Sequence, residues 1–317
     1  MRVTGQHSVA AAAPATGRVR QWWERLRQDD THVGVLFILP FLLASLVFMV
    51  YPVVQVVRMS FYYRNPLRPD QWTFIGLDNF RTIFGDELFW DSFYQATIWT
   101  ASSIVLQAVI GVAIALLLHY PLRGINVFRG LLLFPYIVPT AVIALMWAWI
   151  FNPEIGVLNH VLTTTGIVEE NIYWFSTPAM AMASTIALNV WKYTPFVVIC
   201  VLAKLQTIPL ELYDAARVDG AGPFRRFRDV TLPNLAEVLM VVIVFRTIWT
   251  FNKFEEIYLL TKGGPGTSTF NLAIYSFEQS IANLKLGVGA ATGVVMTVML
   301  LAGSILYLRV MRFGRED

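Results

Sequence analysis

The chain has 317 residues, of which 56% are hydrophobic and 14% are charged, and its formal net charge is +3. A soluble domain keeps about a quarter of its residues charged because its surface faces water. The composition therefore argues against a soluble protein and predicts an all-α polytopic membrane protein. Helices are favoured over a barrel because the apolar runs are continuous rather than alternating.

The first 32 residues precede the first apolar run. They contain an Ala-rich polar stretch and then a basic segment with Trp22 and Trp23, but no apolar core before Val33. A signal peptide would need such a core. We interpret residues 1–32 as a cytoplasmic arm that ends in an interfacial helix near Gln21–Gln28, with the two tryptophans at headgroup depth.

Six apolar stretches follow, and each reaches the roughly 20 residues that a helix needs to cross the hydrocarbon core. We predict six transmembrane helices at about 33–57, 93–118, 129–151, 180–203, 238–260 and 286–308. They make up one domain, 33–310, with a long loop at 204–235 between spans four and five. A short tail follows at 311–317.

The Lys and Arg residues indicate the orientation. Fifteen of the 24 lie in the N-terminal arm, around the turn before span three, in the 204–235 loop and in the tail, whereas six lie on the other side. Basic residues accumulate on the cytoplasmic side. We therefore expect both termini in the cytoplasm, as an even number of spans requires. The isoelectric point near 9.0 follows from this topology and indicates no nucleic-acid partner.

Residue types that carry chemistry are scarce. The four histidines are scattered, no phosphate-binding loop occurs, and Cys200 is the one cysteine of the sequence. We therefore expect no catalytic residue, no metal site and no cofactor bound by this chain. A transporter without a nucleotide loop must use an ion gradient or draw energy from a partner.

The loop between spans four and five contains a pattern in fixed register. Its members are Asp214, Ala215, Ala216, Gly220, Leu232 and Pro233. The pattern resembles the cytoplasmic signature of binding-protein-dependent ABC importer permeases, with Asp214 in place of the usual Glu and Val230 in place of the usual Ile. The resemblance implies a coupling helix that docks in a cleft of a separate ATPase subunit. The residues expected to form this coupling element are Glu211, Leu212, Tyr213, Asp214, Ala215, Ala216, Gly220 and Pro233.

Local sequence also favours a short helix in this loop. Pro209 and Pro223 bracket the segment, and Gly220 permits a sharp exit from a helix. The small side chains of Ala215 and Ala216 let another protein approach the backbone closely. A plain interhelical loop is the alternative interpretation.

Two more motifs, Phe74–Phe80 and Thr261–Pro265, resemble the carbohydrate-type, MalF-like permeases. This resemblance extends from about Val33 to the end of span six and implies the type I ABC importer architecture, with this chain as a non-catalytic permease subunit. The implied partners are a MalG-like second permease, a homodimeric ATPase that binds ATP and Mg, and an extracytoplasmic sugar-binding protein. The implied location is the cytoplasmic membrane of a bacterium or archaeon.

Polar side chains inside two spans are candidate substrate contacts, because charges at membrane depth are costly and usually line a cavity. Helical spacing puts each set on one face. The sets are Asn189, Lys192, Tyr193 and Phe196 in span four, and Arg246, Trp249, Thr250 and Lys253 in span five. Hydrogen-bonding groups interleaved with aromatic rings suit the hydroxyls and C–H faces of a sugar. The MalF-like resemblance puts all of these except Asn189 at sugar-contact positions.

Lys192, Arg246 and Lys253 depart from the MalF-like pattern, which has mostly small or amide residues there. They could instead pair with Glu255, Glu256 or the partner permease and hold helices together. They could also favour an anionic polyol such as glycerol phosphate. An ion-coupled secondary transporter is a further alternative, which would typically carry internal repeats and a buried acid that stands alone; the sequence shows neither.

Small residues and prolines are predicted to shape the helices. Pairs that allow close packing are Gly111 with Ala115 and Gly289 with Gly293. Prolines expected to bend their helices are Pro40 and Pro52 in span one and Pro135 and Pro139 in span three.

Overall fold

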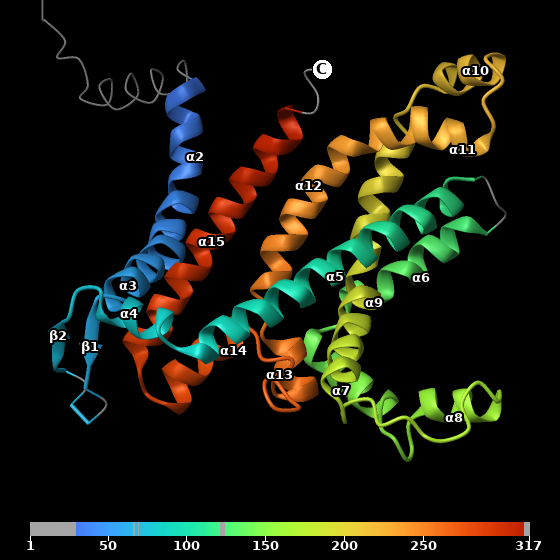
Figure 1. Cartoon of the computed structure of the whole chain (residues 1–317). Helices are drawn as coiled ribbons and strands as arrows, with labels where there is room; N and C mark the ends of the chain where they lie inside the picture. Colours follow the sequence, from blue (N-terminus) through green and yellow to red (C-terminus); the bar gives the residue numbers. More distant parts are fainter. Residues whose placement is uncertain (1–29, 66, 69, 121–123, 314–317) are drawn as a thin grey trace, which may run out of the picture. The chain divides into compact units, whose positions relative to one another are not determined.

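The computed structural model describes residues 30–65, 67–68, 70–120 and 124–313 (Figure 1). The predicted arm and the interfacial helix near Gln21–Gln28 lie outside the described residues, apart from the last residues of the arm. The final four residues of the predicted tail also lie outside them. The chain divides into two compact units, 1–56 and 57–317, and each is described by itself.

A helical run makes up the described part of the first unit. It consists of α2 (Asp30–Ser45), the π-helix η1 (Leu46–Val50) and the first part of α3 (Tyr51–Met59). The segment Phe37–Met59 is long and apolar enough to cross a membrane, and it overlaps the first predicted span. Its apolar residues occupy the whole circumference, which is typical of a helix that faces lipid.

The second unit contains the remaining elements. It opens with an antiparallel hairpin of β1 (Tyr62–Arg64) and β2 (Trp72–Phe74), in which Tyr62 is opposite Phe74. The helices that follow are α4 (Asp78–Phe84), α5 (Glu87–His119), α6 (Ile125–Ile137), α7 (Thr140–Ile150), α8 (Val157–Thr164), α9 (Pro178–Leu205), α10 (Leu210–Val218), α11 (Pro223–Arg226), the π-helix η2 (Phe227–Thr231), α12 (Leu232–Phe251), α13 (Glu255–Thr261), α14 (Leu272–Phe277), the π-helix η3 (Glu278–Ala282) and α15 (Leu286–Phe313).

Five helices of the described chain can cross a membrane, and α6 with α7 makes a sixth span if that bent pair counts as one. The two helices meet at 96°. Val138 between them is extended, with φ −66° and ψ 135°, because the following Pro139 disfavours a helical residue before it. The predicted third span, 129–151, is therefore two helices, and the bend expected at its prolines is a full break.

The fifth predicted span, 238–260, is also interrupted. α12 ends at Phe251 and α13 begins at Glu255. The Asn252 side chain turns back to donate to the Ile248 carbonyl (2.9 Å), as happens where a helix ends. At its other end the apolar helix begins earlier than predicted, because η2 leads without interruption from α11 into α12.

α5 and α9 pack along each other in the middle of the second unit (Figure 1). Gly111 permits this approach, because a Cβ built on it would lie 2.7 Å from Val197 Cγ1. Ala115, one turn further along α5, is fully buried. This close contact confirms the first small-residue pair. The second pair differs: Gly289 packs against Ser280 in η3, and no described atom comes within 4 Å of a Cβ built on Gly293.

We expect Gly111→Ala to destabilise the protein by forcing α5 and α9 apart. Overpacking costs about 1–3 kcal/mol, and the better helix propensity of Ala offsets roughly 1 kcal/mol of it. The thermal unfolding midpoint of the detergent-solubilised chain should fall by about 2–4 °C. Gly293→Ala is the matched control and should leave the midpoint unchanged or raise it. Equal midpoints for the two variants would contradict the close approach.

Candidate functional site

The two predicted polar stripes meet where α12 ends and α13 begins. Asn189, Lys192, Tyr193 and Phe196 come from α9, and Arg246, Trp249 and Thr250 come from α12. Lys253 lies in the connection to α13. Most of the polar members are hidden inside the chain, since the exposed fraction is 0% for Asn189, 3% for Lys192, 6% for Tyr193, 2% for Arg246 and 0% for Thr250.

The carboxylate of Glu256 in α13 forms the centre of this cluster and is 1% exposed. Its Oε2 accepts a hydrogen bond from Asn189 Nδ2 (2.6 Å), and its Oε1 accepts one from the Tyr193 hydroxyl (2.6 Å). Lys253 Nζ lies 3.6 Å from Oε1 and also donates to the Tyr193 hydroxyl oxygen (2.6 Å). Glu256 therefore ties α9 to the segment that joins α12 and α13.

Arg246 continues the cluster toward α5. Its guanidinium lies over the Tyr193 ring, 4.2 Å from the centroid, in a cation–π arrangement. Nε donates to Gln107 Oε1 (2.9 Å), and Nη2 donates to Thr250 Oγ1 (3.1 Å). Gln107 in turn donates to Asn189 Oδ1 (2.8 Å), which closes the network between α5, α9 and α12.

Lys192 lies at the break between α6 and α7. Its Nζ donates to Thr140 Oγ1 (2.7 Å) and lies 3.4 Å from the Val138 carbonyl oxygen. That carbonyl is at the C-terminus of α6, where helix carbonyls lack internal partners and the helix dipole favours a cation. Lys192 therefore stabilises the broken span, a role that its place in the polar stripe did not indicate.

Four aromatic side chains next to the cluster remain accessible, and we call them the aromatic row: Tyr136, Phe196, Phe245 and Trp249. Phe196 stacks on Tyr136 with centroids 6.1 Å apart and meets the edge of Trp249 at 5.7 Å. Trp249 is 43% exposed and also contacts Phe245. Exposed rings of this kind can stack on the C–H faces of a sugar, while the neighbouring Lys253 side chain, 27% exposed, offers a donor.

Two members of the cluster were not among the predicted site residues. Glu256 entered the sequence analysis only as a possible partner of the cations, and its i, i+3 spacing from Lys253 was the signal for that pair. Gln107 was missed. Its signal was its polarity within the uncharged stretch 92–118.

The short helix predicted in the loop between spans four and five is present as α10 (Leu210–Val218), with Pro209 at its N-cap position. Gly220 permits the sharp exit expected here by taking the left-handed region, with φ +74°. Asp214 pairs with Arg217 on the surface (2.8 Å). Leu210 is 70% exposed and Val218 is 89% exposed, which leaves apolar side chains of this short helix without cover from the described chain.

The other residues predicted for coupling lie in α10 or follow it in the chain. Glu211, Leu212, Asp214 and Ala215 are exposed, while Tyr213 and Ala216 are half-buried. The Tyr213 hydroxyl lies 3.0 Å from Thr231 Oγ1 in η2. η2 leads into α12, the helix that carries Arg246 and Thr250. Pro233 stands in the first turn of α12. Within the described residues, no group of three or more His, Cys, Asp or Glu side chains could hold a metal ion.

Comparison with known proteins gives consistent results. The family described as "Binding-protein-dependent transport system inner membrane component" matches residues 107–313. The sulfoquinovosyl glycerol transport system permease protein SmoG of Agrobacterium fabrum is 36% identical over 92% of this chain and 94% of its own length. The trehalose/maltose transport system permease protein MalF of Thermococcus litoralis is 36% identical over 92% of this chain and 98% of its own length.

Among solved structures, a bacterial ABC transporter involved in the import of the acidic polysaccharide alginate has a chain with the same fold. The TM-score is 0.77 at 22% identity, over 92% of this chain and 98% of that chain. The agreement supports the all-α permease fold expected from the sequence.

We expect Glu256→Gln to destabilise the chain, because the variant removes the charge that accepts bonds from Asn189, Tyr193 and Lys253. Hydrogen bonds to a charged group contribute about 1.5–3 kcal/mol each. The thermal unfolding midpoint in detergent should therefore fall clearly.

Glu255→Gln is the matched control for this variant. Glu255 is the exposed neighbour of Glu256, and surface substitutions usually change stability by less than about 0.5 kcal/mol. If both variants unfold at the wild-type temperature, Glu256 does not organise the cluster.

Proposed function

The chain belongs to the family of binding-protein-dependent transport system inner membrane components, and on that premise we propose that it is one permease subunit of an ATP-driven sugar importer. It would form half of the translocation pathway, and a MalG-like permease would form the other half. An extracytoplasmic binding protein would deliver the sugar. The chain itself is non-catalytic, and ATP with Mg would be bound and hydrolysed by a separate ATPase dimer.

The single observation that carries this proposal is α10, an exposed short helix in the signature loop. Leu210 and Val218 leave apolar surface uncovered, and Ala215 presents only a methyl group to an approaching partner. A helix of this kind docks readily in a groove of another protein. We propose that the docking partner is the ATPase, on the cytoplasmic side of a bacterial or archaeal inner membrane.

A sugar is the substrate class that the surface supports best. The aromatic row gives flat apolar faces, and Lys253 gives a charged donor beside them. Relatives named for trehalose/maltose and for sulfoquinovosyl glycerol transport are each 36% identical to this chain. Substrate contact would then fall on Phe196, Trp249 and Lys253, while the buried predicted residues hold these three in place.

An anionic sugar or polyol is the second candidate. Lys192, Arg246 and Lys253 are three cations, whereas Glu256 is the one buried carboxylate among the described residues. A negatively charged group on the substrate would reduce this excess of positive charge. Sulfoquinovosyl glycerol, named for one relative, has a permanent negative charge of that kind.

An ion-coupled transporter is disfavoured even though the structure contains a buried acid. Glu256 accepts hydrogen bonds from Asn189 and Tyr193 and is paired with Lys253. This alternative is expected to carry a buried acid that stands alone, whereas Glu256 has its donors and its countercharge within the chain. Uptake into vesicles that survives ATP depletion but stops with an ionophore would refute the proposed function.

We expect Ala215→Trp to uncouple the ATPase, because a large ring on the exposed face of α10 blocks close docking. Substrate-stimulated ATP hydrolysis in proteoliposomes should drop about tenfold, with no change in the thermal unfolding midpoint. Ala179→Trp, at an exposed alanine in the first turn of α9, should behave as wild type. If the two variants hydrolyse ATP equally, α10 is a plain loop helix.

We expect Trp249→Ala to weaken import by removing a stacking surface. A central aromatic contact contributes more than about 1 kcal/mol to binding, so the substrate concentration for half-maximal uptake should rise roughly tenfold. Trp149→Ala is the matched control, since Trp149 is 51% exposed on α7 and lies outside the aromatic row. Wild-type uptake by Trp249→Ala would remove this side chain from the site. Competition by neutral and anionic sugars in the same assay separates the two substrate classes.

A further inference from the structure

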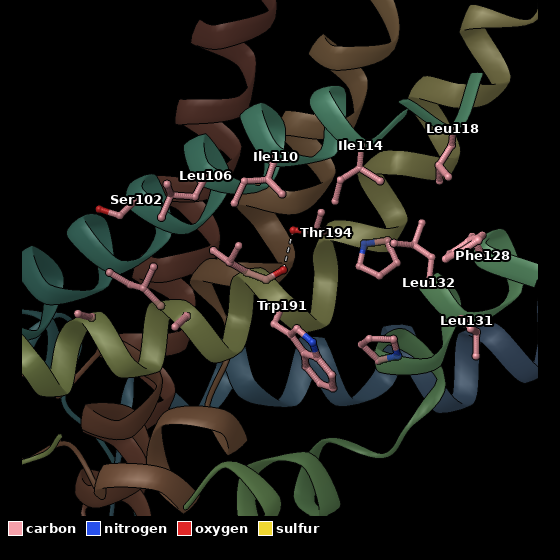
Figure 2. A pocket seen from close by; sticks show the side chains of 16 residues that line it. Ser102, Leu106, Ile110, Ile114, Leu118, Phe128, Leu131, Leu132, Trp191 and Thr194 are labelled. Carbon is pink, nitrogen blue, oxygen red and sulfur yellow. Dashed lines mark hydrogen bonds between the residues drawn. The ribbon is translucent and has the colours of Figure 1, made fainter. Parts of the chain in front are cut away.

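A long apolar groove lies between α5, α6 and α9 (Figure 2), and none of the residues that line it belongs to the Glu256 cluster. Its volume is about 930 Å³. The α5 side is lined at every fourth position by Ser102, Leu106, Ile110, Ile114 and Leu118. At 1.5 Å per residue these positions extend over roughly 24 Å, more than the depth of one membrane leaflet.

The groove suits an apolar occupant. Its facing walls carry Phe128, Leu131 and Leu132 from α6 and Trp191 from α9 (Figure 2). The Thr194 hydroxyl is used by its own helix, because it donates to the Val190 carbonyl (2.7 Å). A sugar would find few free hydrogen-bonding groups here, whereas a hydrocarbon chain would be surrounded by apolar side chains.

A smaller cavity of about 320 Å³ adjoins one end of the groove and shares Leu118 and Leu132 with it. Its wall also contains Gln206, where α9 has just ended, and Arg129 near the start of α6. This end of the groove therefore lies on the side of the coupling loop, which the charge bias assigns to the cytoplasm.

Arg129 lines this cavity, and its guanidinium has donors that no described residue uses. Its Nη2 donates to the Leu118 carbonyl at the end of α5 (2.8 Å). Its Nε is buried and has no hydrogen-bond partner among the described residues, and none of their carboxylates pairs with the guanidinium. A buried donor left unsatisfied costs about 1–3 kcal/mol, and more when it is charged. Because Nε is closed to solvent in this arrangement, an acceptor from outside the chain would remove that cost once the guanidinium turns toward it.

We propose that an anionic phospholipid binds here, with an acyl chain in the groove and a phosphate oxygen that accepts from the Arg129 guanidinium. Phosphate is a favourable acceptor for guanidinium because the bond is charge-assisted. A transmembrane helix of a partner subunit could fill the apolar part of the groove. Such a helix would bring no anion to Arg129, so the lipid accounts for both the groove and the cation.

The test uses the full chain with its copurifying subunits. The complex is reconstituted in nanodiscs that contain equal amounts of phosphatidylglycerol and phosphatidylcholine. Native mass spectrometry counts the lipids that remain bound. Wild type should retain phosphatidylglycerol in preference to phosphatidylcholine, and Arg129→Gln should reduce that retention about tenfold. Arg309→Gln, at an exposed arginine near the end of α15, should retain it as wild type does.

A second variant tests the groove without changing Arg129, whose bond to Leu118 also supports the fold. Ala187→Phe, at a residue that lines the groove, should expel the acyl chain and reduce the retention of both lipids. Ala101→Phe makes the same change in another apolar groove, between α5, α12 and α15. This control variant should retain both lipids as wild type does. Unchanged phosphatidylglycerol retention in both Arg129→Gln and Ala187→Phe would overturn the proposal. Cross-linking of Leu106→Cys to a partner permease, with no retained lipid, would overturn it as well.

Discussion

The Glu256 carboxylate determines how the surrounding side chains must be arranged. A charge that is removed from water is costly unless donors and a countercharge surround it, and Glu256 is 1% exposed. Asn189 and Tyr193 supply donors from α9, and Lys253 supplies a countercharge from the segment before α13. The Tyr193 ring then receives Arg246 on its face. One buried carboxylate thus fixes the relative positions of α9, α12 and α13.

The sequence predicted the number of apolar segments well, because length and apolarity decide whether a helix can cross a membrane. It was less informative about where these helices break. Pro139 indicated a bend in the sequence. The 96° angle between α6 and α7 also depends on how these helices pack and on Lys192, which donates to Thr140 at the break. The early end of α12 was also hidden, since Phe251 to Glu255 reads as part of one apolar run with a few charges.

The predicted site residues fall into two groups that the sequence could not separate. Helical periodicity put Arg246, Trp249, Thr250 and Lys253 on one face, but periodicity does not show which member of a face is covered by a neighbouring helix. Arg246 and Thr250 are covered, whereas Trp249 is 43% exposed. The partner of a buried cation is equally invisible in sequence, because Gln107 lies 139 positions before Arg246.

α10, the segment predicted for coupling, and the Glu256 cluster are joined by one helical path. The Tyr213 hydroxyl links α10 to η2 through Thr231, and η2 runs directly into α12, which carries Arg246 into the cluster and Trp249 into the aromatic row. Packed helices shift between discrete arrangements rather than deforming continuously. On the proposed function, a displacement of α10 by the ATPase would therefore reach the aromatic row and the Glu256 hydrogen bonds together. Charge-assisted hydrogen bonds depend on good geometry. Such a shift would therefore leave the Glu256 bonds intact or replace them with bonds to other partners. Two discrete arrangements of this kind suit a pathway that opens to one side of the membrane at a time.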